Sequence, residues 1–163
     1  MAIGVEVVDR RPQCIVLNYK LSADLNHLRI PVIKESVRED GLWNHTCFEA
    51  FVMENGGPAY REFNFSPSGA WQVYDFGGYR NGGPMMSTHL VSGECRTDAN
   101  GLAMAVMIPA ELLPSGDRLR LGLSAVIEQT NGKLSYWALH HPSDKPDFHH
   151  PNAFVLSLDI RSL

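Results

Sequence analysis

Apolar residues recur at every second position along several short stretches of the chain. Between residues 13 and 21 they fall at Ile15, Leu17, Tyr19 and Leu21. A repeat of two residues is the pattern of a β-strand that buries one face. The same reasoning, with turn residues as boundaries, predicts further strands at 3–8, 25–30, 60–66, 70–76, 87–96, 102–108, 119–128, 134–139 and 153–160.

Three segments depart from this alternation. Cys47 to Met53 is apolar on both faces apart from one acid, which is typical of a central strand. Gly77 to Pro84 is rich in glycine and is predicted to be a long surface loop. Residues 109–113 carry a proline followed by Ala-Glu-Leu-Leu, which predicts one short helical turn.

About ten short strands with almost no helix predict an antiparallel β-sandwich of the jelly-roll type. The dipeptides Asn100-Gly101 and Asn131-Gly132 are hairpin signals between neighbouring strands. The chain has 163 residues and no shift of composition along it, so we expect a single domain over residues 1–163.

Charge and composition narrow the range of partners. The net charge is −4 and no basic run occurs, which argues against nucleic acid and anionic membranes as partners. No apolar run reaches membrane-spanning length, and the first residues lack the features of a signal peptide. We therefore expect a cytoplasmic protein, in which the three cysteines, Cys14, Cys47 and Cys95, are reduced. Assembly into a homo-oligomer stays open.

Glu49 is the anomalous residue of the chain. It lies in the predicted central strand, where its neighbours on both faces are apolar. A buried carboxyl group must be paired, protonated or directed at a polar ligand. Two interpretations stay open at this point. Glu49 either holds a loop through Arg61, Arg80 or a histidine, or contacts a ligand directly.

Aromatic residues near Glu49 suggest what such a ligand is. The chain has three tryptophans, Trp43, Trp71 and Trp137, and Tyr79 lies in the glycine-rich segment. Sugars present C–H faces that stack on aromatic rings, whereas tryptophans also commonly fill a core. Trp43, just before the central strand, is the best candidate for a stacking residue, and Trp137 is the next. Sugar hydroxyl groups also need planar polar partners, which Asn64 and Arg80 can provide together with Glu49.

Cofactor chemistry has weaker support. The histidine pairs 140–141 and 149–150 match no established zinc spacing, and calcium could be bound only through Asp40, Asp144 or Asp147. Met85-Met86 and the histidines could supply axial ligands to a heme that is not covalently attached, since no CxxCH motif is present. No cofactor is expected, although heme and calcium remain alternatives.

Catalysis is not indicated by any motif. The chain lacks GxSxG, P-loop, HExxH and dinucleotide-binding fingerprints. The segment Ser66-Pro67-Ser68-Gly69 is interpreted as a tight turn rather than as part of a triad. Three functions remain: a non-catalytic sugar-binding module, a heme-binding or electron-transfer module, and a small enzyme with an acid and a histidine in one cleft.

Two motifs resemble a known family. Leu-Trp-x-x-x-Cys-Phe-Glu-x-Phe at residues 42–51 and Tyr-x-Glu-Phe-Asn-Phe-Ser-Pro-x-Gly at 60–69 are similar to the DOMON-like sandwiches related to family 9 carbohydrate-binding modules. Residues 123–128 and 134–149 resemble the bacterial stand-alone DOMON-like proteins. The resemblance covers about residues 10–160 and implies a sandwich that binds sugars or heme.

In the sugar-binding modules of that family a terminal sugar lies between two tryptophans. The resemblance therefore implies Trp43 and Trp137 as the two stacking rings, with Glu49, Asn64 and Arg80 around the sugar. Those modules are usually secreted and attached to a glycosidase, whereas no export signal is recognised here. A polysaccharide ligand is therefore less expected, and soluble sugars, a cell-wall precursor or a protein partner stay open. The full set of candidate ligand-binding residues is Trp43, Glu49, Asn64, Trp71, Tyr79, Arg80, Trp137 and His141.

Overall fold

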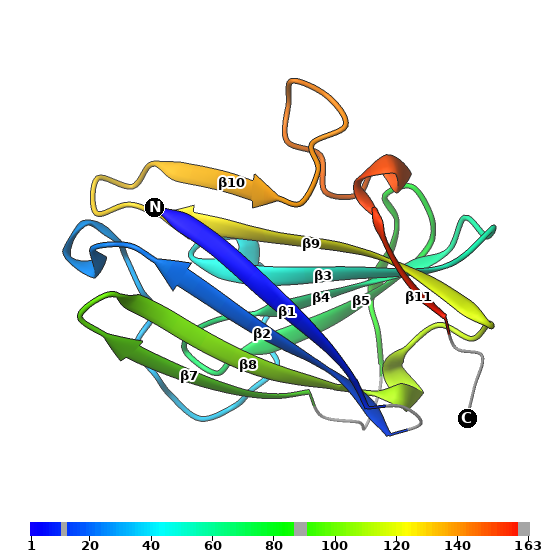
Figure 1. The fold of residues 1–163 in the computed structure, drawn as a ribbon, viewed down its shortest axis with the longest axis horizontal. Coiled ribbons are helices and arrows are strands. Elements are labelled where there is room, and N and C mark those ends of the chain that lie inside the picture. Colours follow the sequence, from blue (N-terminus) through cyan, green and yellow to red (C-terminus); the bar gives the residue numbers. More distant parts are fainter. Residues whose placement is uncertain (11–12, 87–90, 160–163) are drawn as a thin grey trace.

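Two antiparallel sheets face each other in the computed structural model, which describes residues 1–10, 13–86 and 91–159 (Figure 1). Within these ranges the chain forms eleven strands and four short 3₁₀ turns, and no α-helix. This confirms the predicted antiparallel β-sandwich. No helix in the described ranges is long and apolar enough to cross a membrane.

The smaller sheet has four strands in the order β1-β2-β8-β7. Their bounds are β1 Ala2–Arg10, β2 Cys14–Ser22, β8 Gly101–Pro109 and β7 Ser92–Asp98. The larger sheet has the order β10-β9-β3-β4-β5-β6, and β11 pairs with β9. Its strands are β3 Cys47–Glu54, β4 Tyr60–Phe65, β5 Trp71–Gly78, β6 Asn81–Pro84, β9 Arg118–Glu128, β10 Leu134–Ala138 and β11 Leu156–Asp159.

The four 3₁₀ turns are η1 Leu25–His27, η2 Leu42–Asn44, η3 Ala110–Leu112 and η4 Pro151–Ala153. η3 is the helical turn predicted from the sequence. η1 corrects the strand predicted at residues 25–30. The Asp24 side chain accepts a hydrogen bond from the Asn26 backbone N–H at 3.0 Å, which favours a helical turn. Only Leu28 of that segment makes a β-bridge, with Gln129.

β6 corrects the prediction of a loop over residues 77–84. Its residues pair with β5, and a side chain at Gly82 would lie 2.0 Å from the Asp75 carbonyl oxygen. Glycine here therefore permits close pairing of two strands instead of preventing a strand. Of the strand predicted at 87–96, residues 87–90 lie outside the described residues, and β7 begins at Ser92.

The hydrophobic core fills the space between the two sheets. β8 alternates regularly between buried and exposed positions, as expected of a strand with one face in water. β3 places Phe48, Ala50 and Val52 in this core. The Tyr19 ring of β2 packs 5.0 Å from the Phe48 ring, and its hydroxyl group donates to the Glu49 carbonyl oxygen at 2.9 Å. These contacts fix β3 against the opposite sheet.

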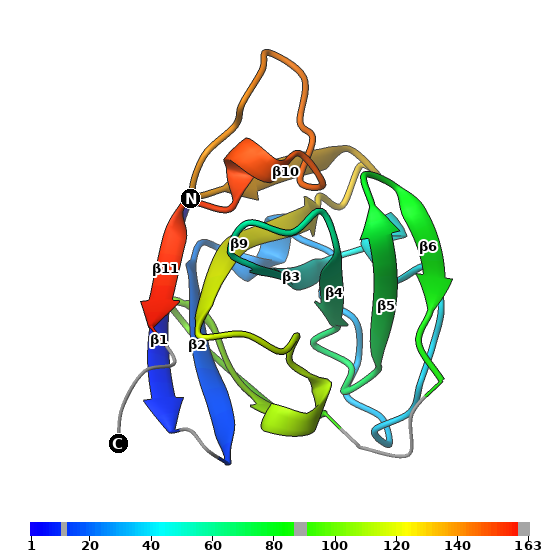
Figure 2. The same cartoon turned by 90° about the vertical axis from the view of Figure 1, so that its right-hand side faces the viewer.

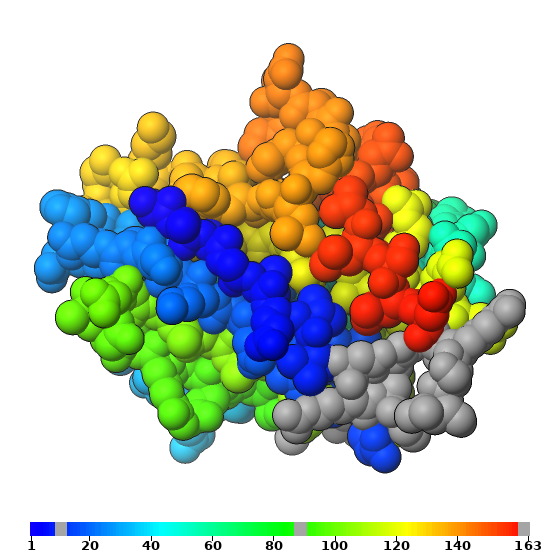
Figure 3. Space-filling model, in the orientation of Figure 1, coloured from blue at the N-terminus to red at the C-terminus, as the bar shows by residue number. Residues whose placement is uncertain are grey.

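The outer face of the larger sheet is also partly buried. A second cluster of buried apolar residues lies there, built around Phe51, Tyr60, Phe76 and Phe154. The segment from the end of β10 to η4 covers this part of the sheet (Figure 2), and it stands out from the surface in the space-filling view (Figure 3). Gly122 on β9 allows Phe154 to lie close against the sheet, because an added Cβ at this position would lie 2.6 Å from the Phe154 ring.

Candidate functional site

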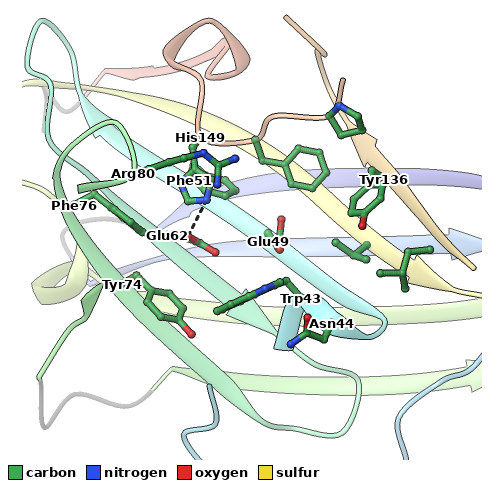
Figure 4. Close-up of a pocket in the computed structure, with 14 residues that line it drawn as sticks. Trp43, Asn44, Glu49, Phe51, Glu62, Tyr74, Phe76, Arg80, Tyr136 and His149 are labelled. Carbon is green, nitrogen blue, oxygen red and sulfur yellow. Dashed lines mark ion pairs between the residues drawn. The ribbon is translucent and has the colours of Figure 1, made fainter. Parts of the chain in front are cut away.

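A pocket of about 430 Å³ opens on the outer face of the larger sheet, beside the covering segment (Figure 4). Strands β3, β4 and β5 form its floor. η2, the β9–β10 pair and residues 146–149 form its walls. The lining residues are Trp43, Asn44, Glu49, Phe51, Glu62, Tyr74, Phe76, Arg80, Val126, Leu134, Tyr136, Pro146, Phe148 and His149.

Strand register brings two carboxyl groups together on the pocket floor. In the β3–β4 pair Glu49 lies opposite Asn64, and Phe51 lies opposite Glu62. Glu49 and Glu62 are therefore diagonal neighbours on one face of the sheet. Ser124 on β9 lies opposite Glu49 on its other side. A row of polar side chains thus crosses the floor of an otherwise aromatic pocket.

The Glu49 side chain is 2% exposed. Its Oε2 atom accepts a hydrogen bond from the Ser124 hydroxyl group at 2.9 Å. Burial raises the pKa of the Glu49 carboxyl group to about 8, and the charge of Glu62 adds to this effect. The arginine or histidine partner that was considered for Glu49 is not found among the described residues, where its side chain bonds to the Ser124 hydroxyl group.

Glu62 is the second acid of the pocket and is 5% exposed. The Asn64 Nδ2 atom donates to its Oε1 atom at 2.9 Å, and His149 Nε2 lies 3.6 Å from its Oε2 atom. Burial raises the pKa of Glu62 to about 7, although the Asn64 hydrogen bond and Arg80 oppose the shift. Asn64 is fully buried, and its Oδ1 atom has no hydrogen-bond partner in the part of the chain that the structure describes.

His149 is held as a neutral ring. Burial and the charge of Arg80 lower the pKa of His149 to about 4. The Tyr60 hydroxyl oxygen accepts the Arg80 backbone N–H at 3.1 Å, so its own proton is available to His149 Nδ1 at 2.9 Å. The remaining imidazole proton is then on Nε2, facing Glu62.

Aromatic rings form the walls. Trp43 is 40% exposed, and its ring meets the Tyr74 ring edge to face at a centroid distance of 5.6 Å. Tyr74 is oriented by a hydrogen bond from its hydroxyl group to Asp40. On the opposite wall the rings of Tyr136 and Phe148 lie 6.2 Å apart. Figure 4 shows the Glu49 carboxyl group between Trp43 and Tyr136.

The rim of the pocket is held by Asp147. Its carboxylate accepts hydrogen bonds from the Tyr79 hydroxyl group at 2.7 Å and from Arg80 Nη2 at 3.0 Å. Both donors come from the β5–β6 turn, where Arg80 has a φ of 53°. Arg120 on β9 also donates to the carbonyl oxygens of Pro151 and Phe154. These contacts attach the covering segment to the sheet.

The structure brings only some of the predicted site residues together. Trp43, Glu49 and Arg80 line the pocket. Asn64 lies on the same face behind Glu62. Tyr79 belongs to the rim and is 55% exposed. His141 does not line the pocket, but its ring lies 6.1 Å from the ring of Phe148, which is a lining residue.

Two tryptophans that were predicted to bind the ligand lie on the opposite, inner face of the sheet. Trp71 is 3% exposed in the core, with the Arg38 guanidinium group 4.5 Å above its ring. Trp137 packs against the same core, and its Nε1 atom donates to Ser135 Oγ at 3.1 Å. Alternation along β10 directs Trp137 inward and Tyr136 toward the pocket. Trp43 and Trp137 therefore do not face one another across this pocket.

Several lining residues were not among the candidates from the sequence. They are Glu62, Tyr74, Phe76, Tyr136, Phe148 and His149. Glu62 had a usable signal, because it alternates with Phe63 and Phe65 and so must share the outer face with Glu49 once β3 and β4 pair. Phe148 had none, and His149 was considered only as a cofactor ligand, because both reach the pocket through an irregular segment.

The residues considered for cofactors do not gather in the described ranges. No group of three or more His, Cys, Asp and Glu side chains is placed there to hold a metal ion. Asp40 and Asp147 accept hydrogen bonds from tyrosines. Met86 is 92% exposed, and Met85 packs against the core. The three cysteines are free thiols.

Comparison with known proteins supports the fold. No family model and no curated protein matches the chain by sequence. A crystal structure from Bacteroides uniformis ATCC 8492, of a "putative carbohydrate-binding protein", is similar with a TM-score of 0.70. The alignment has 17% identity and covers 96% of this chain and 77% of that one. At this identity the likeness is one of fold.

Proposed function

We propose that this protein binds the terminal unit of a glycan in the pocket on the outer face of the larger sheet. The observation that carries the proposal is the pocket itself, in which aromatic walls surround two buried carboxyl groups. Its volume of about 430 Å³ is in the usual range for small-molecule sites. The solved neighbour, described as a "putative carbohydrate-binding protein", supports the proposal at the level of fold.

The aromatic walls suit the apolar faces of a sugar ring. Trp43 stands at the mouth with part of its ring exposed, and Tyr136 stands opposite and is 45% exposed. A ring between them would cover both aromatic faces and place its hydroxyl groups toward Glu49. Tyr136 thereby takes the place that the family resemblance assigned to Trp137. We include in the proposal that the chain belongs with the DOMON-like sandwiches.

The acid pair favours binding over hydrolysis. Glycoside hydrolysis needs one carboxyl group protonated and a second ionised at the working pH. Here burial raises the pKa values of both Glu49 and Glu62, and no cation among the described residues lies within ion-pair distance to hold either one ionised as a nucleophile or base. We therefore favour a binding module.

The test is calorimetry with a panel of soluble disaccharides. We expect Trp43→Ala to weaken binding at least tenfold, because it removes one wall of the pocket. Trp137→Ala is the matched control, since it deletes the same residue type on the opposite face. Affinity is referred to the folded fraction of each variant. Equal losses in the two variants, or no binding of any disaccharide to the unmodified protein, would contradict the proposal.

A further inference from the structure

The two acids of the pocket lack a cation. No lysine, arginine or N-terminal nitrogen in the described ranges lies within ion-pair distance of Glu49 or Glu62, and the contact of Glu62 with His149 at 3.6 Å involves a ring whose pKa is about 4. Two diagonal carboxyl groups on a buried face repel each other when both are ionised. Of the cationic side chains among the described residues only Arg80, which is beyond ion-pair distance, acts against the raised pKa of Glu62, and it does not bring that pKa back to its usual value.

The nearby cations are engaged elsewhere. Arg80 pairs with Asp147 at 3.0 Å, and Arg120 donates to the backbone carbonyl oxygens of the covering segment. Asp40 adds a further acid beside the pocket and accepts from Tyr74. In the part of the chain that the structure describes, the groups that face the acid pair thus supply donors and further negative charge, but no unpaired positive charge.

The acids are nevertheless prepared to act as acceptors. The Ser124 hydroxyl group donates to one oxygen of Glu49, and the Asn64 amide donates to one oxygen of Glu62. Hydrogen bonds of this kind favour the ionised form of a carboxyl group. Glu49 is 2% exposed and lines the pocket, and its second carboxyl oxygen accepts no hydrogen bond from the described residues. A donor from a ligand can complete this arrangement.

The walls are suited to a cation as well. The faces of tryptophan and tyrosine attract ammonium groups, most strongly where water is excluded. Trp43, Tyr74 and Tyr136 all line the pocket that contains the two acids. Aromatic rings that surround an ammonium group are a recurring mode of recognition for such ligands.

We propose that the pocket selects a sugar that carries a free amino group, and that the ammonium group lies between Glu49 and Glu62. The inference rests on the proposed sugar-binding function and specifies its ligand class. The ammonium group supplies the missing charge and donates to the carboxylate oxygens. A neutral sugar leaves the two acids without a cation, and an N-acetylated sugar replaces the charge by a bulkier amide.

Binding of such a ligand has a distinctive proton balance. In the empty pocket around pH 6.5 the acids hold protons, because their pKa values are raised. An ammonium group between them favours the ionised forms, so protons leave the carboxyl groups and pass to the buffer. A neutral sugar causes no such release.

The experiment compares three β-1,4-linked disaccharides that differ at carbon 2: cellobiose, di-N-acetylchitobiose and the diamine of chitobiose. Calorimetry is run at pH 6.5 in two buffers of different ionisation enthalpy, which counts the protons released. We expect the diamine to bind at least tenfold more tightly than cellobiose. We also expect release of between about one and two protons per complex for the diamine, because both acids hold protons at this pH, and none for cellobiose.

The variants Glu49→Gln and Glu62→Gln keep the shape of the pocket and remove its charge. In each variant the preference for the diamine over cellobiose should fall to about threefold or less. Glu111→Gln, which changes an exposed acid on η3, is the matched control and should keep the full preference.

Two results would overturn the inference in distinguishable ways. Equal binding of cellobiose and the diamine, with no proton release, refutes the amino-sugar ligand and leaves the proposed sugar-binding function in place. If none of the three disaccharides binds, the proposed function fails and the inference fails with it.

Discussion

Three glutamates lie on the outer face of the larger sheet, and the chain treats them in two ways. Glu128 at the end of β9 is 6% exposed, but the Arg29 and His45 side chains that cover it are themselves exposed, so it lies nearer the surface than Glu49 and Glu62. Glu128 accepts from Arg29 Nη1 at 2.8 Å and His45 Nδ1 at 2.7 Å. These partners lower its pKa, with His45 making the largest contribution. The pKa values of the pocket acids are raised instead.

This difference separates a structural acid from the two acids to which we assign ligand binding. Glu128 ties the segments that follow η1 and η2 to the sheet through Arg29 and His45, and its charge is balanced within the chain. Glu49 and Glu62 do not tie segments together through ion pairs, because their hydrogen-bond partners are neutral donors. An uncompensated buried carboxyl group costs stability. We infer that the protein tolerates this cost at the position where a ligand can offset it.

The largest expected effect is an inverted dependence of stability on pH. Glu49 and Glu62 have folded-state pKa values of about 8 and about 7, above the usual value of 4.5. The folded protein therefore holds more protons than the unfolded chain between pH 4.5 and these values. The free energy of unfolding should fall as pH rises through this window, by up to ~1.4 kcal/mol per pH unit for each acid.

His149 acts in the opposite direction over part of that window. Its folded-state pKa of about 4 lies below the usual 6.5, so its contribution is lost as pH falls from 6.5 toward 4. The decline in stability should therefore be steepest from pH 6.5 to 7, where both acids act without this opposition. Urea denaturation at half-unit pH steps measures the slope. A curve that is flat or rising from pH 5 to 8 would show that the acids are compensated.

Single substitutions should separate the two kinds of acid by sign. Glu128→Gln should lower the free energy of unfolding at pH 8 by about 1–2 kcal/mol, because it weakens two charge-assisted hydrogen bonds. Glu49→Gln should raise it by about 1 kcal/mol or more at the same pH, because it removes an uncompensated buried charge. Urea midpoints of the two variants and the parent protein give the comparison. If Glu49→Gln is as destabilising as Glu128→Gln, Glu49 is a structural residue.

A smaller effect is expected at Ser124, the donor to Glu49. Ser124→Ala removes the hydrogen bond of 2.9 Å that favours the ionised carboxyl group. The pKa of Glu49 should rise further, and the affinity for a cationic sugar should drop about fivefold, which corresponds to ~1 kcal/mol. Ser135→Ala, on the inner face of β10, serves as the matched control. Unchanged affinity in Ser124→Ala would mean that Ser124 does not prepare Glu49 for the ligand.

The fold followed from local patterns more readily than the site did. Alternation predicted most strands because each buries one face, and the doubly buried β3 was recognised as central for the same reason. The strand at 25–30 was wrong because the Asp24 cap outweighs a short apolar run. β6 was missed because a glycine-rich strand looks like a loop until its partner is known.

The site depended on information that no single segment contains. Glu62 meets Glu49 only through the register of β3 with β4, and His149 arrives from 87 residues further along the chain than Glu62. Trp137 and Tyr136 are adjacent, so a choice between the two faces of β10 decided which ring enters the pocket. The sequence indicated an acid and aromatic rings, whereas tertiary pairing determined which ones meet.

The smallest expected effect concerns Arg80, the cation that decides whether Glu62 is truly uncompensated. Arg80 has a φ of 53°, a region that costs a non-glycine residue about 1 kcal/mol and that glycine adopts freely. Its guanidinium group pairs with Asp147 with 53% of the Arg80 side chain exposed, so the ion pair contributes about 0–1 kcal/mol. The relief of backbone strain and the loss of the ion pair nearly cancel in Arg80→Gly. Its free energy of unfolding at pH 8, measured by urea denaturation, should therefore lie within about 0.5 kcal/mol of the parent value. Arg80→Ala keeps the backbone cost and should be less stable than Arg80→Gly by about 1 kcal/mol. If Arg80→Gly instead loses several kcal/mol at pH 8 but not at pH 5, Arg80 compensates Glu62, and Glu62 belongs with Glu128 rather than with Glu49.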